Sequence, residues 1–236
     1  MKTVSVGDTH GTAVADVVLK IIDNHDKFIF AGDYVDSFDV DNISMKKNLL
    51  DLIGLKITHP DKIVLLWGNH DIHYLLGSDY YSSGYRPEMK KDFHEIFLSN
   101  SNLFHLSYQV NDCLWTHAGI NSRWFEDRFR PFAEEHRGAS SFAELLNYAF
   151  EKRYPALFDV GYTRGGRYET GGPLWCDKSE LTANPIQGLH QIVGHNRVKQ
   201  IQRINKYDKE IALIDILENE EKISESSFFY KEIDDR

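Results

Sequence analysis

Five short motifs in this chain carry the residue types that divalent metal ions bind. In chain order they are Gly7-Asp8-Thr9-His10-Gly11, Gly32-Asp33-Tyr34-Val35-Asp36, Gly68-Asn69-His70-Asp71, Thr116-His117-Ala118-Gly119 and Gly194-His195. Carboxylate and amide oxygens mixed with imidazole nitrogens suit manganese, iron or zinc better than calcium. The candidate ligands are Asp8, His10, Asp33, Asn69, His117 and His195. Because a carboxylate such as Asp33 can bridge two cations, this set predicts two bound divalent ions.

Two such ions, about 3.5–4 Å apart, hold a bridging hydroxide and clamp the oxygens of a phosphoryl group. In-line attack by that hydroxide would hydrolyse a phosphoester, and the departing oxygen then needs a proton. His70, which follows Asn69, is the candidate general acid. An imidazole that keeps its proton near neutral pH needs a carboxylate beside it. Asp36, three residues after Asp33, is the candidate partner.

Most of the motifs follow a run of aliphatic or β-branched residues, which predicts that they lie at the ends of strands. One predicted strand ends at Gly7, and four others cover residues 27–31, 62–67, 112–116 and 191–193. Helical spacing of apolar residues predicts helices over 13–22 and 41–58, the second capped by Asp41 or Asn42. This alternation is typical of an α/β protein. Residues 211–217 and 226–230 are expected to form a late antiparallel pair of strands.

The middle of the chain, residues 121–190, has a different pattern. Aromatic and charged residues mix over 123–137, a second helix is expected over 142–153, and a glycine-rich loop follows at 161–173. The glycines of this loop lack the spacing of a P-loop or a dinucleotide-binding motif. Because the chemical motifs run from residue 8 to residue 195, we expect one domain over 1–236 with a cap-like insertion at 121–190.

Bulk composition limits the partners of this protein. The 236 residues carry a formal net charge of −9, which argues against nucleic acid as a partner. A phosphorylated substrate is still compatible, since bound divalent ions reverse the local charge. Two cysteines, Cys113 and Cys176, lack the spacing of a disulfide framework or a zinc ribbon. With no signal peptide expected and no membrane-length apolar stretch, we expect a cytoplasmic protein that does not bind membranes.

The ordered set of motifs resembles the calcineurin-like metallophosphoesterases, specifically their phosphoprotein phosphatase branch. The resemblance covers residues 4–200 and implies a four-layer α/β/β/α sandwich with its site at the strand ends. It implies that one metal is held by Asp8, His10 and Asp33. The other would be held by Asp33, Asn69, His117 and His195, with His70 and Asp36 as the acid and its partner. Glycine-flanked Asp and His are also ordinary turn formers, but turn chemistry does not explain five ordered motifs.

The second motif departs from the family pattern. Protein phosphatases usually continue it with Arg-Gly, whose arginine grips the substrate phosphate, whereas this chain has Ser37-Phe38. Because a guanidinium binds phosphate through two parallel hydrogen bonds, other arginines are candidates for this role. The candidate phosphate-binding residues are Arg86, Arg164, Arg167 and His73. For each arginine, a solvated surface position is the alternative.

The subfamily and the substrate stay open at this stage. Asp71 replaces the glutamate usual in protein phosphatases, and the third motif with His73 looks like that of symmetrical diadenosine tetraphosphate hydrolases. His117-Ala118-Gly119-Ile120 with Trp124 also looks like those hydrolases, while Pro173-Leu174-Trp175-Cys176-Asp177 is similar to the Leu-Trp-Ser-Asp stretch of protein phosphatases. Our leading interpretation is a binuclear phosphomonoesterase most like a serine/threonine phosphatase. The alternatives are a dinucleoside polyphosphate hydrolase and a non-catalytic metal-binding interaction module.

Overall fold

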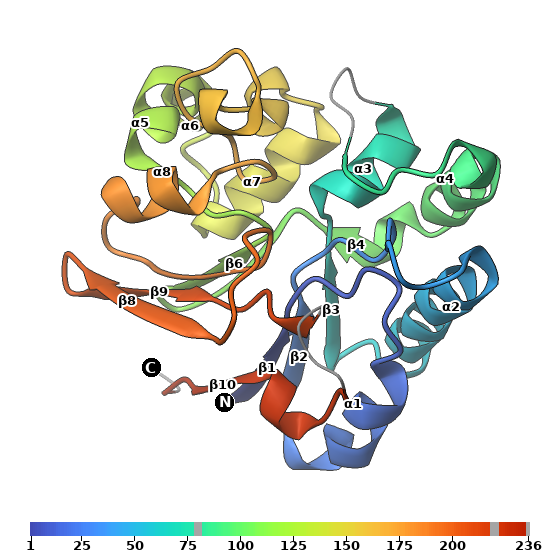
Figure 1. Ribbon diagram of the computed structural model, residues 1–236. Helices are drawn as coiled ribbons and strands as arrows, with labels where there is room; N and C mark the ends of the chain where they lie inside the picture. Colours follow the sequence, from blue (N-terminus) through green and yellow to red (C-terminus); the bar gives the residue numbers. More distant parts are fainter. Residues whose placement is uncertain (78–81, 218–221, 235–236) are drawn as a thin grey trace. The chain divides into compact units, whose positions relative to one another are not determined.

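The computed structural model describes residues 1–77, 82–217 and 222–234. They form two compact units, Met1–His105 with Asp215–Arg236, and Leu106–Ile214. Figure 1 shows the course of the chain through the elements of both units. The predicted insertion at 121–190 lies within the second unit, and its description as an insertion in a single domain stays a prediction. No helix of the described ranges is long and apolar enough to cross a membrane.

The first unit contains a five-stranded mixed sheet in the order β10-β1-β2-β3-β4. Its strands are β1 (Lys2–Val6), β2 (Lys27–Phe30), β3 (Ile63–Leu66), β4 (Phe104–His105) and β10 (Phe229–Glu232). β1, β2, β3 and β4 are parallel neighbours, and β10 pairs with β1 in the antiparallel sense. The carboxyl ends of β1, β2 and β3 therefore open at one edge, and the first three motifs follow these strands.

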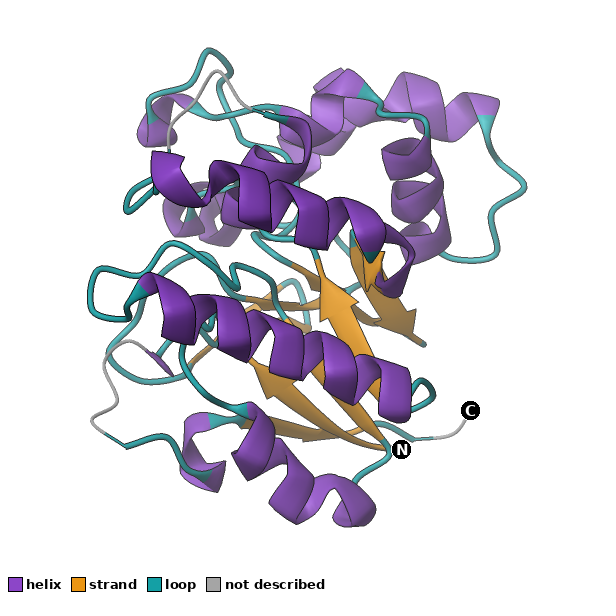
Figure 2. Ribbon diagram, turned by 90° about the vertical axis from the view of Figure 1, so that its right-hand side faces the viewer, coloured by secondary structure: helices purple, strands orange, loops and turns teal. Residues whose placement is uncertain are grey.

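The helices of the first unit are α1 (Ala15–Ile21), α2 (Asn42–Thr58), α3 (Asn69–Leu76) and α4 (Lys90–Ser99). β2 and β3 are nearly continuous apolar runs, as expected for parallel strands covered on both faces. The predicted cap of α2 is confirmed, since the Asp41 carboxylate accepts hydrogen bonds from the backbone N–H groups of Ile43 and Ser44. Figure 2 distinguishes the helices from the strands.

The second unit contains another five-stranded mixed sheet, in the order β5-β6-β7-β9-β8. Its strands are β5 (Ser107–Val110), β6 (Cys113–Thr116), β7 (His190–Val193), β8 (Gln202–Lys206) and β9 (Lys209–Leu213). β6, β7 and β9 are parallel neighbours, with β5 and β8 antiparallel at the two edges. The fourth motif follows β6 and the fifth follows β7, so these two motifs also begin at adjacent strand ends.

The helices of the second unit are α5 (Ser122–Trp124), α6 (Arg130–Glu135), α7 (Phe142–Glu151) and α8 (Lys178–Ala183), with a π-helical turn at Phe125–Phe129. Their aromatic side chains pack together, and Trp124 stacks on Phe129 with ring centroids 5.1 Å apart. Trp124, Phe129 and Phe132 of the 123–137 segment are thus buried in the core of the helical region, while Phe125 is half-buried. The predicted helix over 142–153 corresponds to α7, which begins at the Ser141 cap.

One expectation about the strands is wrong. The two late strands do not pair with each other, because β9 lies between β7 and β8 in the second sheet and β10 pairs with β1 in the first. The chain passes from the second unit to the first after Ile214, so β10 meets the strand nearest the start of the chain. The predicted α/β class with mixed sheets is confirmed by the two sheets and their helices.

Candidate functional site

In the first unit, backbone hydrogen bonds join the loops that carry the first two motifs. The His10 N–H donates to the Asp33 carbonyl oxygen at 2.9 Å, and the Gly11 N–H donates to the Tyr34 carbonyl oxygen at the same distance. His10 and Asp33 have φ angles of 41° and 53°, in the left-handed region that non-glycine residues seldom adopt. These loops are therefore held in uncommon conformations at the points where they carry candidate ligands.

His10 is buried and held in the form that binds metal ions. Its Nδ1 lies 2.8 Å from the Val35 carbonyl oxygen, a distance that assigns the ring proton to Nδ1 and the lone pair to Nε2. Burial, followed by the charge of His70, lowers the pKa of His10 to about 4. The imidazole is therefore neutral near pH 7, and its second nitrogen is oriented by a carbonyl in the manner usual for metal-binding histidines.

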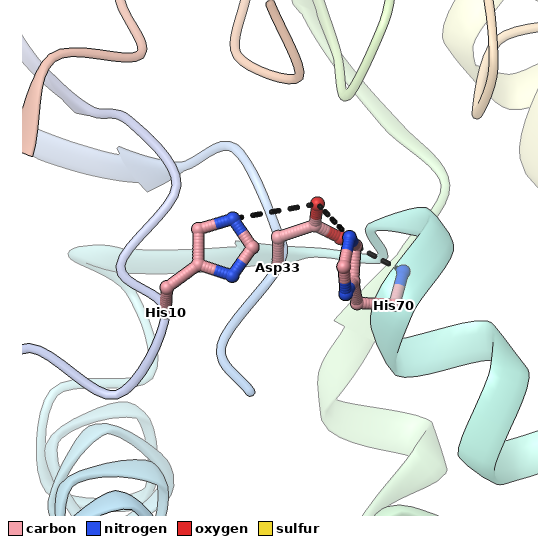
Figure 3. A group of neighbouring side chains, drawn as sticks. All are labelled: His10, Asp33 and His70. Carbon is pink, nitrogen blue, oxygen red and sulfur yellow. Dashed lines mark hydrogen bonds and ion pairs between the residues drawn. The ribbon is translucent and has the colours of Figure 1, made fainter. Parts of the chain in front are cut away.

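Asp33 lies between two imidazole rings (Figure 3). One of its oxygens, Oδ2, is 4.0 Å from Nε2 of His10 and 3.8 Å from Nε2 of His70. One potential ligand atom from each of these three residues lies within 4.8 Å of the other two. The other oxygen, Oδ1, accepts a hydrogen bond from the His70 backbone N–H at 3.0 Å. Within this buried group, the Asp33 carboxylate and the His10 imidazole are donors that suit a divalent transition metal.

His70 and Asp36, the predicted acid and its partner, are in direct contact. Nδ1 of His70 lies 2.9 Å from Oδ2 of Asp36, whose side chain is fully buried. Burial by itself lowers the pKa of His70, but the charges of Asp33 and Asp36 and the hydrogen bond to Asp36 outweigh it, so the net shift is upward. The structure brings these residues together as the sequence analysis expected, while their catalytic roles stay a prediction.

Three further predicted residues of the first unit, Asp8, Asn69 and His73, are buried. Asp8 follows β1 and is buried, and Asn69 is the first residue of α3, where its side-chain amide contacts Oγ of Ser82 at 3.4 Å. His73 lies three residues after His70 and is buried, with its ring centroid 4.3 Å from that of Tyr85. Asn69 is thus one residue from His70, and His73 packs against an aromatic ring.

Asp71, which departs from the family pattern, has a structural role that was not expected from the sequence. Its fully buried carboxylate accepts hydrogen bonds from the backbone N–H groups of Asp33, Tyr34 and Gly68, each at 2.9 Å. The bond to Gly68 caps the start of α3, and its position three residues into a helix could have indicated this bond. The bonds to Asp33 and Tyr34 fix the second motif against the third.

In the second unit, His117 and His195 follow neighbouring parallel strands and lie against each other. Nε2 of His117 is 3.1 Å from Nδ1 of His195, and the ring centroids are 4.9 Å apart. His117 is fully buried, and His195 has a φ angle of 61°. The ring of Trp175 meets that of His195 edge-on at 6.0 Å. Two imidazole nitrogens at this separation can serve as ligands of one cation.

The candidate phosphate-binding arginines differ in what they contact. The Arg164 guanidinium lies 2.9 Å from Oδ2 of Asp177 and 2.5 Å from Oδ1 of Asn196, the residue after His195. Arg167, in the same loop, is exposed. Arg164 therefore lies beside the fifth motif, and phosphate binding by either arginine stays a prediction.

Arg86 holds the segment that follows the second motif. Its guanidinium donates to the carbonyl oxygens of Ser37 and Val40, at 2.5 and 2.9 Å, and to the side-chain oxygen of Asn42. Ser37, in the position of the family's phosphate-gripping arginine, accepts through Oγ from the backbone N–H groups of Asp39 and Val40 at 3.1 Å. A tight turn therefore takes the place of that arginine here. Phosphate binding by Arg86 stays a prediction.

The sequence that carries these motifs matches a known family. The family profile of calcineurin-like phosphoesterases matches residues 1–208. The chain belongs to this family. Its members are metal-dependent, which agrees with the candidate metal group around Asp33.

Two known proteins are similar to this chain, one over a short stretch of sequence and the other in its fold. A probable serine/threonine-protein phosphatase of Encephalitozoon cuniculi is 39% identical to it over 70 residues, a match that spans 28% of this chain and 14% of that protein. A protein serine/threonine phosphatase from Saccharomyces cerevisiae with similarity to human phosphatase PP5 shares its fold, with a TM-score of 0.54 at 17% identity over 90% of this chain and 67% of the other. The predicted metallophosphoesterase fold is thereby confirmed.

Proposed function

We propose that this protein is a binuclear metal-dependent phosphoesterase that hydrolyses phosphomonoesters, most like a serine/threonine phosphatase. Family membership supports phosphoester hydrolysis. The observation that carries the mechanism is the buried group in which Asp33 lies between His10 and His70 while Asp36 binds the far side of His70. This group combines metal ligands with a proton donor in one place, as hydrolysis of a phosphoester requires.

Bound divalent ions would supply an activated water and neutralise the charge of the phosphoryl group. The chain's own residues supply the rest. His10 presents Nε2 as a ligand because the Val35 carbonyl holds its proton on Nδ1. His70 holds its Nδ1 proton on Asp36, which leaves Nε2 to deliver a proton to the departing oxygen. The carboxylates beside His70 favour its protonated form, which is the form that a general acid needs.

For two ions, the resemblance implies ligands beyond Asp8, His10 and Asp33. These are Asn69, His117 and His195, and the 3.1 Å contact between the two histidines supports a metal role for both. The mixture of oxygen and nitrogen donors favours manganese, iron or zinc as the native ions. We infer a phosphorylated protein or a small phosphoester as the substrate.

The test is turnover of p-nitrophenyl phosphate and phosphopeptides by the purified protein, after chelation and after addition of Mn²⁺. We expect activity to depend on the metal, and metal content should approach two ions per chain. His70→Asn should keep its metal and lose roughly 10²–10⁴-fold in kcat. His59→Asn, at the carboxyl end of α2, is the control. A fully loaded protein without turnover, or unchanged turnover in His70→Asn, would contradict the proposal.

The dinucleoside polyphosphate hydrolase is the second candidate. The turn at Ser37, in place of a phosphate-gripping arginine, favours a substrate that is held differently from a phosphopeptide. Release of ADP from diadenosine tetraphosphate, with phosphopeptides left intact, would select this activity. Tight binding of two ions with no hydrolysis of any of these substrates would instead support the non-catalytic metal-binding module.

A further inference from the structure

The carboxylate of Asp36 has a second buried partner besides His70. The hydroxyl of Tyr74 donates to Oδ1 of Asp36 at 2.5 Å, while Nδ1 of His70 bonds to Oδ2 at 2.9 Å. His70 and Tyr74 are four residues apart on α3, so both side chains project from the same face of the helix. The carboxylate is therefore held from both of its oxygens by one helix.

The neighbours of the Tyr74 hydroxyl determine that it donates its hydrogen bond to Asp36. The backbone N–H of Arg86 donates to the Tyr74 hydroxyl oxygen at 3.0 Å, which leaves the hydroxyl proton for Asp36. Burial of Tyr74, followed by the negative charge of Asp36, raises the pKa of the hydroxyl, which therefore stays protonated. A continuous series of donors thus runs from the Arg86 amide through Tyr74 to Asp36.

Asp36 needs such support because its own backbone conformation is uncommon. Its φ angle is 68°, in the left-handed region that is unfavourable for a residue with a side chain. A carboxylate on a strained backbone can fix the ring of His70 only if its own orientation is fixed. The Tyr74 hydroxyl provides that constraint, since it binds the oxygen that His70 does not use.

We propose that Tyr74 is a positioning residue for hydrolysis, which acts through Asp36 to orient the His70 ring toward the leaving oxygen. The inference rests on the proposed role of His70 as general acid and adds a residue from outside the five motifs. The proposal predicts that the effect of losing Tyr74 on kcat depends on the leaving group. A misoriented acid slows expulsion of a poor leaving group much more than expulsion of one that departs without a proton.

The first test compares two substrates in Tyr74→Phe. We expect kcat for phenyl phosphate to fall roughly tenfold, as for the loss of a hydrogen bond to a charged group. The kcat for p-nitrophenyl phosphate, whose leaving group is stable as an anion, should fall much less, and both KM values should stay close to wild type. Equal losses for the two substrates, or no loss, would overturn the proposal.

Tyr34→Phe is the matched control for removal of a buried tyrosine hydroxyl. That hydroxyl donates to the backbone carbonyl of Leu66 at 2.9 Å instead of a carboxylate. We expect this variant to keep the wild-type ratio of the two kcat values, whatever its stability. In an Asp36→Asn background, Tyr74→Phe should cause little further loss of kcat, because the two residues act as a unit. Additive losses would contradict an action through Asp36.

A spectroscopic measurement separates this inference from the proposed function. The Nδ1 proton of His70 should give a downfield proton resonance that is absent in His70→Asn, and Tyr74→Phe should shift or broaden it. A wild-type protein without turnover on any substrate would contradict the proposed function, and the resonance would still report whether Tyr74 holds the ring. A resonance that is identical in Tyr74→Phe and wild type would overturn the positioning role.

Discussion

The Asp71 carboxylate binds three backbone N–H groups, so we expect Asp71→Asn to destabilise the protein by about 2–4 kcal/mol. One oxygen accepts from Asp33 and Gly68, and the other accepts from Tyr34. An asparagine oxygen can replace the first, but the side-chain NH₂ group would then face the Tyr34 N–H. One buried donor loses its partner, which costs about 1–3 kcal/mol.

The remaining two hydrogen bonds lose their charged acceptor, and charge-assisted bonds are roughly twice as strong as neutral ones. Part of the total cost is offset, because burial and then repulsion from the Asp33 carboxylate raise the pKa of Asp71 well above its ordinary value, and Asp71→Asn removes this unfavourably placed charge. The net loss is read from the midpoint and slope of urea unfolding followed by circular dichroism. Asp41→Asn is the control, since Asp41 caps α2 at an exposed position, where Asp and Asn are equivalent caps.

The same substitution should also weaken metal binding, because Asp71 fixes the backbone of Asp33. Loss of such an outer partner typically costs 10–100-fold in affinity, and calorimetric titration with Mn²⁺ measures it directly. If Asp71→Asn unfolds within about 0.5 kcal/mol of wild type, the three hydrogen bonds do not carry the stability assigned to them. If Mn²⁺ affinity is also unchanged, Asp71 does not hold Asp33 in place.

Three further predictions concern groups outside the Asp33 cluster. Arg128→Ala leaves the buried Asp159 carboxylate without its guanidinium partner and should cost about 2–3 kcal/mol in urea unfolding, whereas Arg128→Lys should cost less. Burial raises the pKa of the Cys176 thiol well above its ordinary value of 9.0. The free energy of unfolding therefore does not depend on ionisation of this thiol below pH 9.0. It falls as the pH rises further, because the buried thiol resists the ionisation that the unfolded chain allows. Cys176→Ala should therefore reduce the fall in melting temperature at alkaline pH. Because both cysteines are buried, a thiol reagent should modify neither Cys113 nor Cys176 in the native protein. Arg86→Ala should lower the melting temperature by several degrees, because the Arg86 guanidinium holds the 37–42 segment. A raised KM with an unchanged melting temperature would instead support a role of Arg86 in phosphate binding.

The strands and helices that position the first three motifs could be predicted because their signals are local. The aliphatic runs before Gly32 and Gly68 are β2 and β3, and the Asp41 cap precedes α2 as expected. Strand pairing is not local. β10 pairs with β1 from the other end of the chain, and no pattern within residues 226–230 indicates which strand it pairs with.

The same distinction applies to the site. The His70–Asp36 pair could be proposed because both residues belong to recognisable motifs and the chemistry requires an acid with a partner. The contacts of Asp71 with the Asp33 loop, and of Tyr74 with Asp36, join residues 37 or 38 positions apart. Neither Asp71 nor Tyr74 is among the predicted metal ligands or acid–base residues. Their roles became visible only when the fold placed their side chains against the second motif.

Backbone strain connects these supporting contacts to the chemistry. His10, Asp33, Asp36 and His195 all have positive φ angles. Each such conformation costs free energy that a glycine at the same position would avoid, and it persists only where surrounding contacts hold it. Glycine cannot replace these residues because it has no ligand or acid–base group. The second motif donates backbone hydrogen bonds to the Asp71 carboxylate and accepts one from the Tyr74 hydroxyl. These bonds therefore do more than stabilise a loop, since they offset the free-energy cost of placing the candidate site residues on a backbone that only glycine adopts easily.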